Sequence, residues 1–475
     1  MIRHQDTYFL SPEIALKTAE ENNRSEDGYT LQVCYYAGDK IESDLVNLIH
    51  LPIDNLSEDL ANSIYRIPTS LNLEGFDFSQ ETIDDLVSSF NFSFIQAKTL
   101  RQKLNEEYYN TVQTSNPNFE EEIRFYILAN TNTRVMQYMS RNIAKTLENM
   151  GYSVLLDLHY GCEDTMCLKN IAEFDPHATI NINHLCNSYI GNNIYNFVWI
   201  QDVFGVEGAI SSKHIRKRDN IFHLIDNYGD ALDKANIKST YQSFCIDSTI
   251  YKKRNDIVKK KKIVFLGSSY HHRIKDIQHD KNFKNIYQSI IEIFEKKSML
   301  NMNANDDNSD VKFLMHKYNK PEEFIGLTYG YILRDYCVEK LCSIDTEYEI
   351  EIYGDYWDNN EIVKPFHKGF ANYGEDISKI YNEATYGYCV GGYVLMQRTL
   401  ECACSETIPL VLDTRSRKQD NYDKKIEESM TFFDINNLEE ILKKDVEEKS
   451  FEFIKNEYSY QGFAQKFIDI IKKQK

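Results

Sequence analysis

Residues 379–413 read KIYNEATYGYCVGGYVLMQRTLECACSETIPLVLD, and this stretch decides the fold that the sequence predicts. Its two apolar segments, 386–390 and 408–412, have the composition of short buried strands. Between them we expect a helix opened by Gly391 and Gly392. This order predicts a ligand-binding βα unit, because the turn exposes backbone N–H groups and the start of a helix favours anions. An ordinary tight turn in an α/β domain would have the same glycines.

The same alternation of strand and helix extends to both sides of this stretch. Residues 123–129 form an apolar run that favours a strand, and residues 135–150 have the periodicity of an amphipathic helix. Further on, IVFLG (263–267) and EIEIYG (349–354) are strands that end in glycine. Strands separated by helices in this way predict parallel βαβ units, and we expect two tandem doubly wound, Rossmann-like α/β domains.

Three domains account for the length of 475 residues. We expect an N-terminal accessory domain at 1–118, α+β or mainly helical, which ends at a turn cluster in residues 114–118. An N-terminal, acceptor-side Rossmann-like domain should cover 119–250, and a C-terminal, nucleotide-sugar-binding one 251–475. The last helix could pack back on the N-terminal Rossmann-like domain. The accessory domain carries no motif that we can interpret, so partner docking and acceptor recognition both stay open for it.

Composition excludes several classes of protein. The formal net charge is −19, which argues against a nucleic-acid binder. The ten cysteines have no repeated CxxC spacing and fit reduced core thiols, so we expect a cytoplasmic protein. No run reaches the about 18 apolar residues of a membrane span, and no signal peptide is recognisable. One basic stretch, at 251–262, is interpreted as a solvated linker or strand flank that could also attract an anionic donor.

The run MQRTLECACSETIPLVL, together with IVFLGSSYHHR and EIEIYGDYW, resembles the nucleotide-sugar motifs of GT-B glycosyltransferases, especially the bacterial group related to spore-maturation glycosyltransferases. The resemblance covers roughly residues 122–475. It implies a GT-B fold, a nucleotide-sugar donor, with a UDP-sugar as the expected one, and no cofactor or metal. Glu401 matches the second acidic residue of the group's motif, but Tyr393 stands where the first is expected.

Several residues are candidates for holding the donor. Arg273 is the first choice to neutralise the leaving diphosphate and Arg398 the second. Glu401 could accept from the ribose hydroxyls, although a pair with Arg398 within the helix is an alternative. Ser268 could bind phosphate or cap a helix. The whole predicted donor site comprises Ser268, Arg273, Tyr356, Trp357, Gly391, Gly392, Tyr393, Arg398 and Glu401.

Base recognition and catalysis are assigned to two further sets of residues. The aromatic rings of Tyr356 and Trp357 could stack on a pyrimidine or belong to the core. If the enzyme inverts, a general base is needed, and His159 and Asp202 follow strands where they could take a proton from an acceptor hydroxyl. If it retains, which we expect, these two residues only orient substrates.

The sequence thus predicts a metal-independent, hexosyltransferase-like glycosyltransferase that acts on a protein or glycan acceptor. A catalytically altered GT-B-like binding or scaffold protein is the alternative, since the acidic pair of the motif is incomplete. A nucleotide-sugar epimerase of the same two-domain build is a third possibility whose own His and Glu motifs are not apparent in the sequence.

Overall fold

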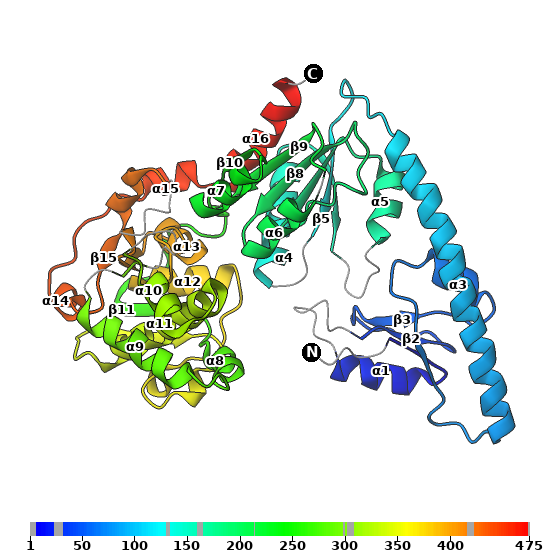
Figure 1. Ribbon diagram of the computed structural model, residues 1–475, viewed down its shortest axis with the longest axis horizontal. Coiled ribbons are helices and arrows are strands. Elements are labelled where there is room, and N and C mark those ends of the chain that lie inside the picture. Colours follow the sequence, from blue (N-terminus) through cyan, green and yellow to red (C-terminus); the bar gives the residue numbers. More distant parts are fainter. Residues whose placement is uncertain are drawn as a thin grey trace. The chain divides into compact units, whose positions relative to one another are not determined.

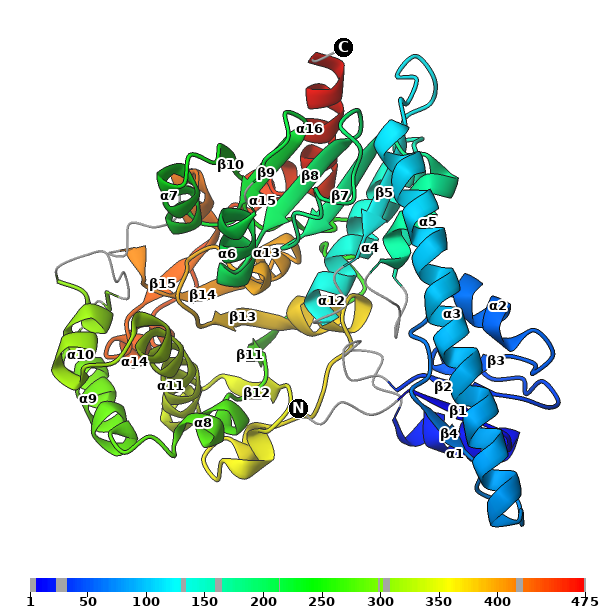
Figure 2. The ribbon, with the colours of Figure 1, turned by 45° about the vertical axis from the view of Figure 1, so that its right-hand side comes forward.

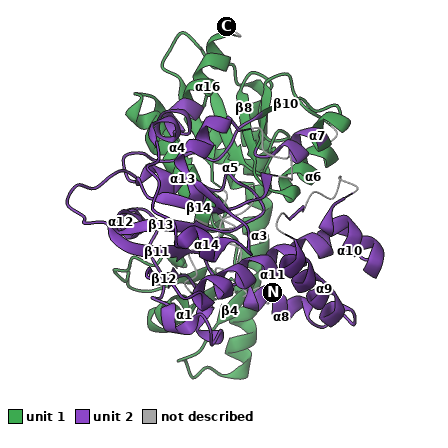
Figure 3. Cartoon of the chain, turned by 90° about the vertical axis from the view of Figure 1, so that its left-hand side faces the viewer, with its two compact units in different colours: residues 1–223, 231–240, 464–475 green, residues 224–230, 241–463 purple. Residues whose placement is uncertain are grey.

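The computed structural model describes residues 6–22, 32–129, 134–158, 165–212, 214–297, 300–301, 308–415 and 422–473. The chain divides into two compact units, coloured separately in Figure 3. Unit 1 comprises Met1–His223, Ala231–Thr240 and Ala464–Lys475, and unit 2 comprises Leu224–Asp230 and Tyr241–Phe463. In the described residues unit 1 contains two parallel sheets and unit 2 contains one, and each unit has its own core.

Unit 1 begins with a small four-stranded sheet whose order is β3-β2-β1-β4. All three strand pairings are parallel. The accessory part therefore contains a parallel sheet, which the predicted α+β or mainly helical arrangement did not specify. Tyr8 and Tyr35 lie fully buried in its core. Its elements are β1 (Thr7–Phe9), α1 (Pro12–Glu21), β2 (Cys34–Tyr36), β3 (Leu48–His50), α2 (Leu56–Asn62) and β4 (Ser70–Asn72).

The longest element of unit 1 is α3 (Gln80–Thr114), a helix of 35 residues (Figure 1). Ser79 starts it, because its side chain accepts a hydrogen bond from the backbone N–H of Thr82. Phe90, Phe94 and Ala97 form its buried stripe at helical spacing and pack into the core of the small sheet. Farther along, α3 contacts α5 of the next sheet, so one helix joins the accessory part to the rest of unit 1 (Figure 2).

A six-stranded parallel sheet forms the other part of unit 1, with the order β10-β9-β8-β7-β5-β6. Phe467, from the last helix of the chain, stacks on Phe197 of this sheet with ring centroids 4.6 Å apart. The elements of this part are β5 (Arg124–Leu128), α4 (Arg134–Asn149), β6 (Ser153–Asp157), α5 (Met166–Phe174), β7 (Ala178–Ile182), β8 (Tyr195–Ile200), α6 (Val203–Ser211), β9 (Asp219–His223), α7 (Asp226–Lys234), β10 (Ser239–Tyr241) and α16 (Tyr460–Lys473). The first residues of α7 and α16 and the last residue of β10 fall within the bounds of unit 2.

Unit 2 contains a five-stranded parallel sheet of order β12-β11-β13-β14-β15. Together the two large sheets confirm the tandem doubly wound domains predicted from the sequence. The elements of unit 2 are β11 (Lys260–Leu266), α8 (His271–Ile277), α9 (Phe283–Lys296), α10 (Asp310–Tyr318), α11 (Glu322–Ser343), β12 (Glu349–Tyr353), α12 (Glu375–Glu383), β13 (Ala384–Cys389), α13 (Gln397–Cys404), β14 (Ile408–Leu412), β15 (Thr431–Phe433), α14 (Leu438–Leu442) and α15 (Glu452–Glu457).

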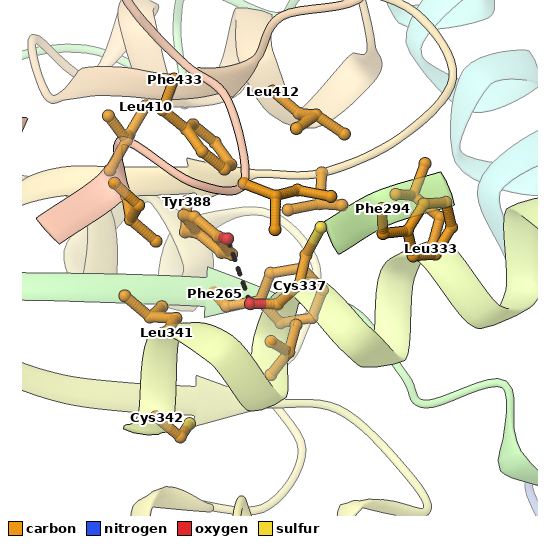
Figure 4. Packing of buried hydrophobic residues seen from close by; sticks show 14 of the residues in the cluster. Phe265, Phe294, Leu333, Cys337, Leu341, Cys342, Tyr388, Leu410, Leu412 and Phe433 are labelled. Atoms are coloured by element: carbon orange, nitrogen blue, oxygen red, sulfur yellow. Dashed lines mark hydrogen bonds between the residues drawn. The ribbon is translucent and has the colours of Figure 1, made fainter. Parts of the chain in front are cut away.

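The largest core cluster of unit 2 lies between α11 and one face of this sheet (Figure 4). Tyr388 of β13 is buried there, and its hydroxyl donates to the backbone oxygen of Cys337 at 3.1 Å. On the other face α13 packs so closely that a Cβ at Gly387 would lie 2.4 Å from the Cys402 sulfur. The glycine therefore sets how near α13 lies to the sheet, and with it where the start of α13 is placed.

The basic stretch 251–262 lies at the amino end of β11, where its lysines form ion pairs. Lys262 contacts Glu351 at 3.0 Å, and Lys260 contacts Glu383 at 2.9 Å. Loops at the amino ends of parallel strands lie on the opposite side of the sheet from the loops at the carboxyl ends. These paired lysines therefore stabilise the sheet and are poorly placed to attract a donor to the carboxyl-end loops. Among the described residues, no helix combines the length and the apolar composition needed to cross a membrane.

Candidate functional site

The order of the strands in unit 2 locates its candidate site. β11 is the first strand of this sheet, and the later strands lie on both sides of it, with β12 on one side and β13 on the other. In open parallel sheets, ligands bind at the carboxyl ends of the strands where the chain order reverses in this way. The site in unit 2 is therefore expected between the loop at 267–273, which follows β11, and the loop at 390–396, which follows β13.

The loop after β11 is fixed by its neighbours. The Ser268 hydroxyl accepts a hydrogen bond from the backbone N–H of Asp355 at 3.0 Å, which leaves its own proton for a ligand oxygen. The next hydroxyl, of Ser269, donates to the buried carboxylate of Asp335 at 2.7 Å. Burial raises the pKa of Asp335, and the hydrogen bonds from Ser269 and Tyr270 offset part of that rise.

Arg273 lies in the first turn of α8, and its side chain is exposed. Among the described residues it forms no ion pair, not even with Asp276 three residues farther along the same helix. The positive charge of Arg273 lowers the pKa of Tyr331, although burial raises it more. Arg273 is thus an uncovered charge in the helix that directly follows the β11 loop.

The two aromatic candidates in the loop after β12 differ in their burial. Trp357 is 0% exposed, and its indole N–H donates to the backbone oxygen of Gly267 at 2.7 Å. Its ring belongs to the core, which corrects its prediction as a stacking surface. Tyr356, by contrast, is 46% exposed, and its ring centroid lies 4.3 Å from that of His272. With φ at 69°, the Tyr356 backbone adopts a left-handed conformation that few non-glycine residues adopt.

The loop after β13 does not form the glycine-opened helix that the sequence predicted. α13 begins only at Gln397, after Tyr393 and three further residues of the loop. A Cβ on Gly391 would lie 2.2 Å from the sulfur of Met396, so the loop folds back and Met396 occupies the space beside this glycine. Gly391 and Gly392 therefore lie on the loop and do not form the start of the helix.

Arg398 and Glu401 form an ion pair at the start of α13. Arg398 Nη1 contacts Glu401 Oε2 at 2.5 Å, and Gln397 Nε2 donates to Glu401 Oε1 at 3.2 Å. Glu401 is 0% exposed, so the pair within the helix is formed and the carboxylate has no open path to a ribose. Burial by itself lowers the pKa of Arg398, but the Glu401 carboxylate outweighs it and the pKa lies above its usual value.

The guanidinium of Arg398 remains partly accessible. Its side chain is 34% exposed, and only one of its nitrogens is taken by the buried carboxylate. Glu401 thus fixes the orientation of Arg398, which keeps further N–H donors beside the loop that follows β13. An arginine held in this way by a buried counter-charge is suited to bind an anion.

Unit 1 has a corresponding reversal point between β5 and β7. Asp202 follows β8 and caps α6, since its Oδ1 accepts from the Gly205 N–H at 2.9 Å. Its Oδ2 accepts from Asn183 Nδ2 at 2.6 Å, so both carboxylate oxygens already have partners. This favours a structural role over that of a general base. His159, the other candidate base, lies outside the described residues.

Two features of the site were missed in the sequence. Asp335 holds the β11 loop from α11, and Met396 fills the space beside Gly391. Neither belongs to a recognisable motif, because each acts across a distance in the chain or within an irregular loop. In the described part of the chain, no group of three or more His, Cys, Asp or Glu side chains is arranged to hold a metal ion.

No protein-family model and no curated protein matches this sequence. Among solved structures, AviGT4, a glycosyltransferase involved in avilamycin A biosynthesis, is 7% identical, with a TM-score of 0.40 over 73% of this chain and 96% of that chain. WaaG, a glycosyltransferase involved in lipopolysaccharide biosynthesis, is 14% identical, with a TM-score of 0.39 over 74% and 99%. The UDP-GlcNAc 2-epimerase from Methanocaldococcus jannaschii is 13% identical, with a TM-score of 0.34 over 74% and 99%. Similarity at this level carries no argument about what this chain does.

Proposed function

We propose that this chain is a glycosyltransferase that moves a sugar from a nucleotide-sugar donor, with a UDP-sugar as the first candidate, to a protein or glycan acceptor. The observation that carries the proposal is Arg398, a partly exposed guanidinium held by the buried Glu401 beside the reversal point of the unit 2 sheet. The resemblance of residues 122–475 to spore-maturation-type glycosyltransferases supports the same assignment from the sequence.

The chemistry of sugar transfer explains why such an arginine is needed. The bond between the anomeric carbon and the phosphate oxygen breaks, and negative charge builds up on the departing nucleoside diphosphate. A fixed cation lowers the barrier when it binds the departing phosphate more strongly in the transition state than in the ground state. Arg398 is oriented before the substrate arrives, so little reorganisation accompanies the reaction.

Other residues of the two loops have complementary roles in this proposal. Ser268 donates its hydroxyl proton to a phosphate oxygen, and Arg273 supplies a second, more mobile charge. Gly391, Gly392 and Tyr393 form the wall of the donor site, where the backbone can approach the diphosphate. Tyr356 remains the candidate for stacking on the base.

We further propose that transfer is independent of a metal ion and retains the configuration at the anomeric carbon. Two arginines near the leaving group would replace the charge that a metal ion supplies in other transferases. A retaining reaction needs no strong general base, which agrees with the engagement of Asp202 in capping α6. His159 stays a candidate for orienting the acceptor.

Nucleotide binding provides the test. Thermal stabilisation by UDP, GDP and CMP, followed by calorimetry with the best of them, should show binding to the full chain. Arg398→Ala should weaken binding of the diphosphate by about 1.5–3 kcal/mol, as expected for a charge-assisted hydrogen bond. Arg398→Lys should recover part of the loss, and Lys443→Ala, which removes an exposed charge directly after α14, should change nothing. Failure of all three nucleotides to bind would refute the proposal.

The alternative is a GT-B-like protein that binds a nucleotide-sugar without transferring the sugar. The burial of Glu401 and the presence of Tyr393 in place of the first acidic residue of the motif favour it. The two functions differ in turnover. A transferase should hydrolyse its donor slowly even without an acceptor, whereas a binding protein should release the donor intact.

A further inference from the structure

A groove of about 680 Å³ lies within unit 1, away from the proposed donor site. One wall is a face of α3, and the other walls are the segment before β4, at Ile67, and the start of α5, at Leu168. It therefore forms where the small accessory sheet meets the six-stranded sheet, next to the region where α3 runs alongside α5 in Figure 2. The proposed donor chemistry makes no use of it.

The α3 wall is a stripe of polar side chains at helical spacing, formed by Lys98, Gln102, Asn105 and Tyr109. At 1.5 Å per residue this stripe is about 16 Å long, the length of about five residues of extended chain at 3.3 Å each. Gln102 and Asn105 contribute amide groups, which contain donors and an acceptor as a peptide unit does. Gln102 Nε2 also donates to Oε1 of Glu106, a further residue of the lining, at 3.4 Å. The stripe thus matches the backbone of an extended polypeptide.

The floor of the groove is apolar. Ile67, from the accessory part, and Leu168, from α5, are almost completely buried and line the groove. Most of the exposed atoms that line the groove are carbon. An aliphatic or aromatic side chain could displace water from this floor, whereas the hydroxyl-covered faces of a sugar chain could not do so to the same extent. Tyr109 is the only strongly exposed aromatic ring that the described lining offers, so a stacking platform for successive sugar rings is absent from that lining.

The groove is held in shape by polar contacts beneath it. Asn105 Nδ2 donates to Thr165 Oγ1 at 2.8 Å, which ties α3 to the start of α5. Arg101 donates to the backbone oxygens of Tyr65 and Ser63, both at 2.8 Å, which ties α3 to the segment before Ile67. At the same end Lys98 is exposed and adds a positive charge, whereas Glu106, about two turns farther along α3, is exposed in the same lining and adds a negative one.

We propose that this groove binds an extended polypeptide segment of the acceptor. An apolar side chain of the peptide packs over Ile67 and Leu168, and an acidic side chain pairs with Lys98. The inference rests on the proposed function, because it identifies the acceptor of that transferase as a polypeptide. It also gives residues 1–118 a role, in which the accessory sheet supplies one wall of the acceptor site.

Selection from a display library of random peptides against the full chain tests the proposal. Enriched peptides should contain an aliphatic or aromatic residue close to an Asp or Glu. Tyr109→Ala and Lys98→Glu should each weaken their binding about tenfold or more, as expected for central contacts of an interface. The matched controls are Phe92→Ala and Lys103→Glu, which change an exposed aromatic ring and an exposed lysine of α3 that do not line the groove.

Three outcomes would overturn the proposal: no peptide is enriched, the control variants lose as much affinity as the groove variants, or neutral oligosaccharides bind the groove in preference to peptides. Calorimetry with UDP on the same variants separates this proposal from the proposed function. Peptide binding without nucleotide binding would support the polypeptide groove and refute the transferase. Nucleotide binding and donor hydrolysis without groove-dependent peptide binding would refute the polypeptide groove alone.

Discussion

Replacing Glu401 with Gln should destabilise unit 2 and weaken diphosphate binding through Arg398. Breaking a fully buried ion pair costs about 3–5 kcal/mol. Here the carboxylate is 0% exposed but the Arg398 side chain is 34% exposed, so water can solvate the guanidinium that is left. Because this solvation reduces the cost, we expect Glu401→Gln to lower the free energy of unfolding by about 2 kcal/mol.

The two tryptophans of the chain make unit 2 measurable on its own. Trp199 lies in unit 1 and Trp357 in unit 2, so a Trp199→Phe background leaves Trp357 as the reporter of unit 2. Urea denaturation should then be compared for Glu401→Gln, Arg398→Met and the double variant. We expect a coupling free energy of about 1–2 kcal/mol between the two positions, and a value within about 0.5 kcal/mol of zero would show that the pair contributes nothing.

Nucleotide analogues then distinguish the indirect role of Glu401 from direct contact with the ribose. In the wild-type chain UDP should bind more tightly than UMP, and Glu401→Gln should reduce that advantage because Arg398 is no longer held in place. The loss caused by a 2′-deoxy ribose should be the same in both proteins. If instead Glu401→Gln abolishes the discrimination against the 2′-deoxy analogue, Glu401 contacts the ribose and this reasoning is refuted.

Four further predictions concern residues that shape or hold the loops around the site. Gly354→Ala should cost about 3 kcal/mol or more in the unfolding of unit 2, because φ is 134° and the new Cβ would lie 2.4 Å from Gly267 O. Gly369→Ala, with φ at 87° and nothing within 4 Å, should cost only about 1 kcal/mol. Trp357→Phe should cost about 2 kcal/mol, measured by circular dichroism, since it loses volume and a hydrogen bond. Burial raises the pKa of Asp335 in the folded state, so its contribution to stability is fully present below the unfolded pKa of about 3.9 and is lost as pH rises through the folded pKa. Asp335→Asn should flatten this decline of Tm above about pH 4, and an unchanged slope would contradict it.

Local sequence patterns predicted the regular elements well. The second strand of the opening stretch, Ile408–Leu412, has the predicted bounds. Runs of apolar residues and the polar turns between them are local properties, and parallel pairing follows from their alternation. The spacing of Arg398 and Glu401 was also sufficient to predict an ion pair between them within the helix, as the alternative to a contact of Glu401 with the ribose.

The rest depended on contacts between distant parts of the chain. The sequence allowed Trp357 as a stacking residue. In the structure the turn at Gly354 places its indole N–H against the backbone oxygen of Gly267, 90 residues earlier in the chain. The helix at Gln397 was expected to begin at the glycines, but Met396 folds back on Gly391 and delays it. Neither outcome can be read from composition or periodicity, because both are set by which loops meet at the carboxyl edge of the sheet.

The division of the chain has a consequence for its synthesis. Unit 1 is completed only by Ala464–Lys475, a segment that follows the whole of unit 2 in the chain. Until then Phe197 and Phe222 lack the ring of Phe467, whose centroid lies 4.6 Å and 5.8 Å from theirs in the folded protein. Unit 2 is synthesised in full before that contact can form. Nascent unit 1 therefore exposes an aromatic surface throughout the translation of unit 2, a period in which a chaperone could bind that surface.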